Sequence, residues 1–183
     1  MTPSADDIQS LIAGCIKNDR RAQEQLYKLF HNAMAALCMR YAKNMEDATE
    51  VMNDGFLKVF KNIQQYEAGK AAISTWIRTI MIHAAIDFLR KKKVNYIDKP
   101  LYEEEAGIEN EAIQKTDADI LLAMIRQLPT ATQLVFNLYA IDGFNHVEIA
   151  SLLDISEGTS RWHVSEARKQ LKQLLQTQQL KNE

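Results

Sequence analysis

The chain has little of what loop-rich or disulfide-stabilised folds require. Its 183 residues include only 6 glycines, 3 prolines and 2 cysteines, Cys15 and Cys38. So few turn-forming residues argue against an all-β sandwich, which needs many tight turns. Two cysteines are also too few for a disulfide scaffold, so we expect reduced thiols and a cytoplasmic protein.

Long apolar runs are missing as well. The longest, Ile120 to Ile125, is far shorter than the roughly 18 residues that a membrane span needs. The N-terminus carries Asp6 and Asp7 and lacks the basic start and apolar core of a signal peptide. The remaining composition, 46% hydrophobic and 25% charged, is that of an ordinary globular chain. We therefore expect a helical protein without direct membrane insertion.

The formal net charge of −2 is unevenly distributed along the chain. Residues 1–93 carry 14 basic and 10 acidic side chains, residues 94–119 carry 2 and 8, and residues 120–183 carry 6 and 6. An acidic stretch with little apolar periodicity is typical of a linker. The sequence therefore predicts an all-α protein with two small helical domains, 1–93 and 118–183, joined by an acidic linker at 94–117.

Two helices are expected early in the first domain. Apolar residues recur at intervals of three and four over Leu26 to Tyr41, and again from Met45 onward. The second of these helices has a polar face. Such a face is solvated in most proteins, and docking on a partner is the second interpretation. The face is made by Glu50, Asn53, Asp54 and Lys58.

A loop from Tyr66 to Ala72 and a long helix from Ile73 to Lys93 complete the first domain. Four cations, Arg90 to Lys93, end this helix. The helix dipole favours cations there, but four exceed what capping needs, which indicates a phosphate-binding patch. Trp76 on the same helix is more often a core residue than a platform for a nucleic-acid base.

The second domain has the signals of a helix-turn-helix. Thr130 and Asn145 each stand three residues before Gln or Glu, the spacing of a capping box that opens a helix. Asp154 can take the left-handed turn conformation, and Ser156 is expected to cap a final helix whose buried stripe ends at Leu175. A short helix, a tight turn and a longer helix are the pattern of this motif.

The final helix presents an outer face that suits DNA. Arg161 and Lys169 can contact base edges or phosphates. Glu166 repels phosphate, although its carboxylate could accept a hydrogen bond from the amino group of cytosine. The whole outer face comprises Arg161, Trp162, Ser165, Glu166 and Lys169.

Motifs of catalysis and metal binding are missing from the sequence. Gly-rich phosphate loops, G-x-S-x-G, H-E-x-x-H and C-x-x-C do not occur. The set of Cys15, His31 and Cys38 lacks the usual zinc spacing. We therefore expect a protein that is not an enzyme, with no catalytic residue, no metal site and no cofactor.

Three segments, in order, resemble bacterial RNA polymerase sigma factors. Asp47 to Phe60 resembles sigma region 2.2, and Ile73 to Arg90 resembles regions 2.3 and 2.4. Leu128-Pro129, then Ile149-Ala150, then Glu157-Gly158-Thr159 resemble region 4. Their order, spacing and total length are similar to those of the extracytoplasmic-function sigma factors, which retain only two domains.

The resemblance implies a signal- or stress-responsive promoter-recognition mechanism. Domain 1–93 would dock on core RNA polymerase and open the minus-ten element, with the Tyr66–Ser74 loop holding a flipped base. Domain 118–183 would read the minus-35 element in promoter DNA, and an anti-sigma factor is an implied partner. The implied docking residues are Glu50, Asn53 and Asp54. The implied DNA-binding residues are Trp76, Arg78, His83, Arg90, Lys91, Lys92, Lys93, Ser160, Arg161, Trp162, Ser165 and Lys169.

Two other classes of function remain open on the sequence. A helix-turn-helix repressor or activator, binding DNA without polymerase, would explain residues 118–183 but leaves the first half without a role. A helical adaptor that binds only proteins would treat the basic clusters as solvated helix ends. Promoter-specific RNA synthesis with purified core polymerase distinguishes both from a sigma factor.

Overall fold

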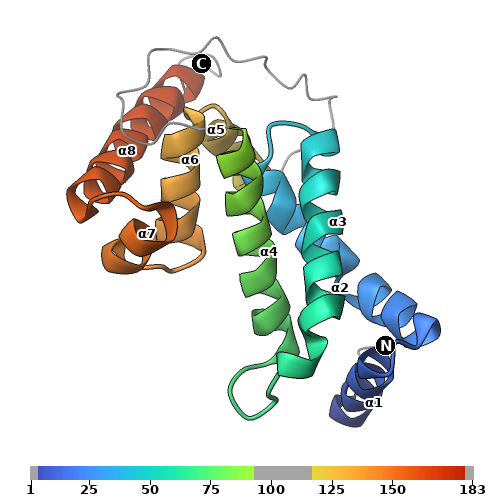
Figure 1. Ribbon diagram of the computed structural model, residues 1–183. Helices are drawn as coiled ribbons and strands as arrows, with labels where there is room; N and C mark the ends of the chain where they lie inside the picture. The colour runs from blue at the N-terminus through green and yellow to red at the C-terminus, as the bar shows by residue number, and fades with distance from the viewer. Residues whose placement is uncertain (1–3, 93–116, 180–183) are drawn as a thin grey trace. The chain divides into compact units, whose positions relative to one another are not determined.

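The computed structural model describes residues 4–92 and 117–179, and every regular element in those two ranges is a helix (Figure 1). The prediction of an all-α chain is therefore confirmed. The chain divides into two units, Met1–Leu89 and Arg90–Glu183. The expected acidic linker at 94–117 lies outside the described residues, apart from its last position.

The first unit is built from helices whose starts are fixed by polar caps. Its elements are α1 (Ala5–Ile16), α2 (Arg20–Tyr41), α3 (Met45–Asn62), the short 3-10 helix η1 (Ile63–Gln65) and α4 (Ile73–Lys91), of which residues 73–89 belong to this unit. The side chains of Ser4, Asp19 and Asn44 each accept a hydrogen bond from a backbone N–H of the following first turn. Such caps satisfy donors that have no partner within the helix.

The predicted helix starts at Met45 and Ile73 are confirmed, whereas the predicted end at Lys93 is wrong. Helix α4 ends at Lys91 and Lys92 lies in a turn, while Lys93 lies outside the described residues. Periodicity alone could not place this end, because the four consecutive cations carry no apolar pattern.

The core of the first unit forms where α2, α3 and α4 meet. Leu26, Val59 and Ile77, one from each helix, are completely buried. Gly55 on α3 faces the Met81 side chain of α4, and a Cβ atom at Gly55 would lie 2.2 Å from the Met81 sulfur. Glycine at this position therefore leaves room for the buried Met81 side chain.

Both cysteines, Cys15 on α1 and Cys38 on α2, are buried free thiols. Burial, together with the charge of Asp19, raises the pKa of Cys15. Burial raises the pKa of Cys38 to about 12, although the Arg40 charge and a backbone hydrogen bond act in the opposite direction. The two side chains thus behave as small apolar core groups.

The second unit contains α5 (Asp117–Arg126), α6 (Thr130–Phe136), the π-helical turn η2 (Asn137–Ile141), α7 (His146–Leu153) and α8 (Glu157–Gln179). The predicted capping box at Thr130 is wrong, because Pro129 occupies the N-cap position and Thr130 is already the first helical residue. Proline fits this boundary for two reasons. Its ring fixes φ, and its missing backbone N–H breaks no hydrogen bond at the start of a helix. Its φ of −51° and ψ of 140° make the transition into α6.

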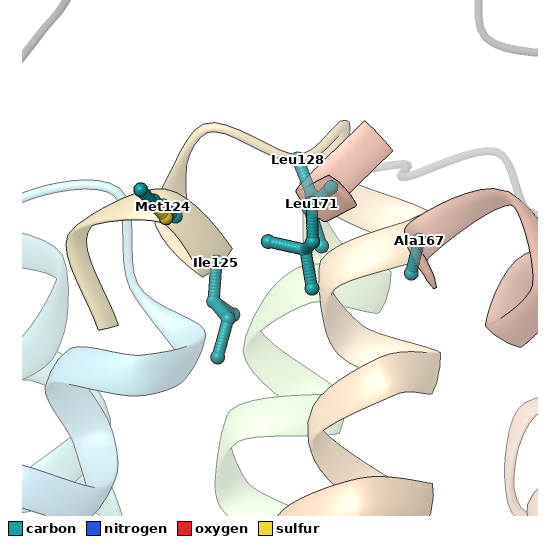
Figure 2. Close-up of a cluster of buried hydrophobic side chains, with 5 residues drawn as sticks. All are labelled: Met124, Ile125, Leu128, Ala167 and Leu171. Atoms are coloured by element: carbon teal, nitrogen blue, oxygen red, sulfur yellow. The ribbon is translucent and has the colours of Figure 1, made fainter. Parts of the chain in front are cut away.

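Apolar side chains from α5, from the turn that follows it and from α8 pack together in the second unit (Figure 2). The fully enclosed members are Met124, Ile125, Leu128, Ala167 and Leu171. Leu175, expected on the same buried stripe, is 45% exposed. The buried stripe of α8 thus ends one turn earlier than the periodicity predicts.

Candidate functional site

Helix α3 presents a mixed polar and apolar face. Glu50 and Asn53 are exposed, and Asp54 is half-buried. Leu57, one turn beyond Asn53, is 70% exposed and shares this face. An exposed leucine is unusual on a helix face that contacts only solvent. Sequence analysis did not include Leu57 in this face.

Lys58 joins this face to α4. Its Nζ atom lies 2.9 Å from a carboxylate oxygen of Asp54 and 2.9 Å from one of Asp87. Partial burial lowers the pKa of Lys58, but the hydrogen bonds and charges of the two aspartates outweigh it and raise that pKa. The pairing with Asp54 follows from helical spacing, whereas the pairing with Asp87, 29 residues away, does not.

Trp76 on α4 is half-buried and packs against the preceding loop. Its ring lies 5.7 Å from the ring of Tyr66, measured between centroids. The Tyr66 hydroxyl in turn donates a hydrogen bond of 3.0 Å to the carbonyl of Ala71. Trp76 therefore helps to hold the loop from Tyr66 to Ala72 in place.

The other expected DNA-contacting side chains of α4 follow its polar side and its C-terminal end. Arg78 is half-buried and His83 is exposed. Arg90, Lys91 and Lys92 are exposed, so this end of the helix presents positive charge to solvent. Lys93 lies outside the described residues.

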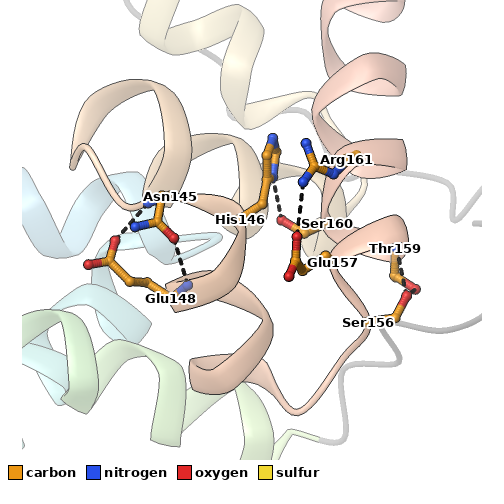
Figure 3. Close-up of polar contacts among 8 residues, drawn as sticks. All are labelled: Asn145, His146, Glu148, Ser156, Glu157, Thr159, Ser160 and Arg161. Carbon is orange, nitrogen blue, oxygen red and sulfur yellow. Dashed lines mark hydrogen bonds and ion pairs between the residues drawn. The ribbon is translucent and has the colours of Figure 1, made fainter.

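Helices α7 and α8 form the predicted helix-turn-helix (Figure 3). The Asn145 side chain accepts from the Glu148 backbone N–H at 3.0 Å, and the Glu148 carboxylate accepts from the Asn145 N–H at 2.7 Å. Asp154 ends α7 in the left-handed conformation, with φ 56° and ψ 48°. Ser156 accepts from the Thr159 N–H at 3.0 Å and caps α8.

The most polar positions on the outer face of α8 are exposed, as expected. Arg161, Ser165 and Lys169, each four residues apart, are exposed, while Trp162 and Glu166 are half-buried. The Arg161 guanidinium lies 2.9 Å from the carboxylate of Glu157, in an ion pair whose side chains are 62% and 47% exposed. Exposed ion pairs contribute little stability, so Arg161 can exchange this carboxylate for a phosphate or base edge.

Ser160 differs from its expected role. Its side chain is completely buried, and its hydroxyl lies 2.9 Å from Nδ1 of His146 (Figure 3). A hydroxyl in this position faces α7, and it would have to leave this partner to reach DNA. The sequence did not reveal that Ser160 is buried, because its hydrogen-bond partner lies on another helix.

His146 is a residue of this motif that sequence analysis did not single out. Its ring stacks on Tyr139 at 4.5 Å with an interplanar angle of 15°, and the guanidinium of Arg168 lies 5.9 Å from the centre of the same tyrosine ring. Burial lowers the pKa of His146, as do the charges of Arg161 and Arg168, while the charge of Glu157 opposes them.

Within residues 4–92 and 117–179, no cluster of three or more His, Cys, Asp or Glu side chains is arranged to hold a metal ion. In that same part of the chain, no helix combines the length and apolar character needed to cross a membrane.

The fold and the helix-turn-helix define a two-unit, all-helical protein of the DNA-binding class. Residues 26–94 match the model of the family described as Sigma-70 region 2. Residues 118–171 match the model described as Sigma-70, region 4.

Known relatives agree with these matches. The chain is 26% identical to the ECF RNA polymerase sigma factor SigM of Mycobacterium tuberculosis, over 90% of this chain and 83% of that protein. It is 26% identical to the ECF sigma factor SigW of Bacillus subtilis, over 87% and 91%. The fold is similar to that of the sigma factor RpoE of Bartonella quintana, solved with the anti-sigma factor NepR, with a TM-score of 0.55 and 20% identity over 84% of this chain and 96% of that chain.

The chain belongs to the sigma-70 family of RNA polymerase sigma factors, in its extracytoplasmic-function group. Proteins of this family act with core RNA polymerase on promoter DNA to initiate transcription.

Proposed function

We propose that the two halves of the chain divide this work. Domain 1–93 docks on core polymerase through Glu50, Asn53 and Asp54 and acts at the minus-ten element. Domain 118–183 reads the minus-35 element, and the acidic linker 94–117 joins them. The side chains offered to the minus-ten element are Trp76, Arg78, His83, Arg90, Lys91, Lys92 and Lys93.

The proposal for the second domain is carried by the outer face of α8. Arg161, Ser165 and Lys169 form an exposed row along the helix that follows the tight turn, which is the position of the recognition helix in this motif. Trp162 lies beside that row and is half-buried. Because Ser160 is buried against α7, we leave it out of the proposed contact surface.

Polymerase docking is supported by the combination of charge and apolar surface on α3. Glu50 and Asn53 offer polar contacts. Leu57 offers an exposed apolar side chain, and covering it with a partner would favour binding. Lys58 fixes Asp54 to α4, so Asp54 is held in one orientation when a partner approaches.

We further propose that the protein works in the cytoplasm, is not an enzyme itself, and responds to a signal through an anti-sigma factor. The support for such a partner is indirect: the solved sigma factor whose fold is similar was crystallised with one.

In vitro transcription with purified core polymerase tests the proposed function. We expect the chain to select particular promoters from a DNA library with randomised minus-35 and minus-ten elements, and RNA to start at those promoters only when the chain is present. Absence of promoter-specific RNA would favour the helical adaptor. Tight, sequence-specific binding by the chain alone would favour the repressor or activator.

Docking is tested by replacing polar residues of α3 without disturbing its apolar side. We expect Glu50→Ala with Asn53→Ala to weaken binding to core polymerase, measured by fluorescence anisotropy of labelled sigma. The matched control is Glu24→Ala with Gln25→Ala on exposed positions of α2, which should bind as the unaltered chain does. Equal affinity of both double variants for core polymerase would mean that Glu50 and Asn53 lie on an ordinary solvated helix face.

A further inference from the structure

Two polar pairs, one buried and one partly buried, hold the first turns of α8. Ser160 and His163 lie three residues apart, and both are completely buried. The Ser160 hydroxyl lies 2.9 Å from Nδ1 of His146 on α7. Nδ1 of His163 lies 3.0 Å from the hydroxyl oxygen of Thr132 on α6. One turn of α8 is thus joined by side-chain hydrogen bonds to two different helices.

Stability alone does not explain polar groups at these positions. Burying a hydroxyl or an imidazole costs free energy that a hydrogen bond only compensates, and an apolar pair of similar shape is often as stable. Hydrogen bonds are short and directional, whereas contacts between apolar side chains tolerate sliding and rotation. The pairs therefore add a defined rotation and depth of α8 relative to α6 and α7.

The surroundings of His146 hold its ring in one place. Tyr139 of η2 stacks on the ring face, and Ser160 is the hydrogen-bond partner of Nδ1. The charged groups that act on His146 are Glu157, Arg161 and Arg168, all from α8. The neutral imidazole is favoured in this setting, and its plane fixes the direction of the bond to Ser160.

We propose that the pairs His146–Ser160 and Thr132–His163 are positioning pairs that orient the recognition helix and thereby set its selectivity for the minus-35 element. They act through Arg161, Ser165 and Lys169, since a small rotation of α8 moves all three relative to the DNA groove. The inference rests on the proposed role of the second domain. It differs from that role in assigning selectivity to residues that hold α8 against its neighbouring helices and do not touch DNA.

The test uses the full chain with core polymerase and a promoter selected from the randomised library. The measured quantity is the ratio of transcription from this promoter to transcription from the same promoter with a scrambled minus-35 element. We expect Ser160→Ala, His146→Leu and Thr132→Val each to lower this ratio about fivefold, the effect of one net hydrogen bond. Ser151→Ala, at an exposed position of α7, is the matched control and should leave the ratio unchanged.

Combined variants separate positioning from direct contact. Ser160→Ala with His146→Leu should lower the ratio no further than either change alone, because both remove the same bond. Full addition of the two losses would mean that Ser160 contacts DNA itself and would overturn the proposal. An unchanged ratio in the single variants would overturn it as well.

A conservative variant distinguishes positioning from loss of folding. Asn places an amide group near the position of Nδ1, so His146→Asn should restore the ratio, whereas His146→Gln should not. Circular dichroism during heating checks that each variant is folded at the assay temperature. A ratio as low in His146→Asn as in His146→Leu contradicts the proposal. A wild-type holoenzyme indifferent to the minus-35 element would overturn both this inference and the proposed role of the domain.

Discussion

Arg161 illustrates how one side chain can serve folding and recognition in turn. In the free chain its guanidinium is paired with Glu157 of the preceding turn, which also places a carboxylate at the favourable N-terminal end of the α8 dipole. Because both side chains are more than one third exposed, solvent screens the pair and its strength is small. DNA offers phosphates and base edges that bind a guanidinium in two-pronged geometry.

We predict that Arg161→Ala costs about 1–3 kcal/mol of binding to promoters with a matched minus-35 element. The loss should concentrate at the base position that Arg161 reads, and affinity for core polymerase should not change. Competition binding of the holoenzyme to single-base variants of the selected promoter measures this. Arg20→Ala, at an exposed position of α2, is the control. A uniform loss across all sequences, with a shallower salt dependence, would instead assign Arg161 to a phosphate.

His146 predicts a pH dependence of the second domain. Its pKa is lowered from the ordinary 6.5 by burial and by Arg161 and Arg168. The folded state therefore binds this proton less readily than the unfolded chain. The stabilisation linked to the neutral ring is present above the unfolded pKa and is lost as the pH falls through the folded pKa.

We expect wild type to lose stability relative to His146→Asn between about pH 7.5 and about pH 5, because the variant lacks this titration. Urea unfolding followed by Trp162 fluorescence measures the difference in a Trp76→Phe background, which removes the other tryptophan. A difference in free energy of unfolding that stays constant across this range would contradict the assigned titration.

At the scale of elements, the contact of α3 with α4 depends on a missing side chain. We predict that Gly55→Ala destabilises the first unit by about 1–3 kcal/mol, the usual cost of overpacking a filled core. The added Cβ would lie 2.2 Å from the sulfur of the buried Met81. Alanine's better helix propensity offsets part of this cost.

Thermal unfolding followed by Trp76 fluorescence measures the effect of Gly55→Ala in a Trp162→Phe background, which removes the other tryptophan. Gly69→Ala is the control, because a Cβ at that loop position meets no atom within 4 Å. Equal melting temperatures for the two variants would show that the Met81 side chain can move aside without cost.

Local sequence signals predicted the elements that local interactions fix. The capping box at Asn145, the left-handed residue Asp154 and the cap at Ser156 all depend on residues within a few positions of each other, and all three are confirmed. The box predicted at Thr130 failed because Pro129 competes for the same boundary. The π-helical turn Asn137–Ile141 carries no periodicity that separates it from an α-helix.

Contacts between distant residues could not be predicted in the same way. The bridge from Lys58 to Asp87 and the bond from His146 to Ser160 join different helices, and their pairing depends on how those helices pack. The family resemblance implied that Ser160 contacts DNA, but only the packing of α7 shows that it is buried. The sequence thus predicted the exposed residues of the candidate site better than the contacts between helices that hold them in place.

At the scale of the whole molecule, charge limits what the chain does alone. Its net charge is −2, and duplex binding depends on neutralising several phosphates. We therefore predict that the free chain binds the selected promoter weakly at physiological salt, while the holoenzyme binds it tightly. Gel-shift titrations with and without core polymerase measure this. Tight, sequence-specific binding by the free chain would support the repressor or activator alternative.

The two buried cysteines have a practical consequence for optical experiments. Maleimide dyes react with the thiolate, and burial raises the pKa of Cys38 to about 12, so very little of this thiol is ionised at neutral pH. Cys15 is buried and its pKa is also raised. Exposed cysteines introduced by Ser10→Cys and Ser151→Cys, one in each unit, should therefore take a donor and an acceptor dye without removal of the native thiols. Energy transfer between the dyes would then report how far apart the two units lie before and after polymerase binds.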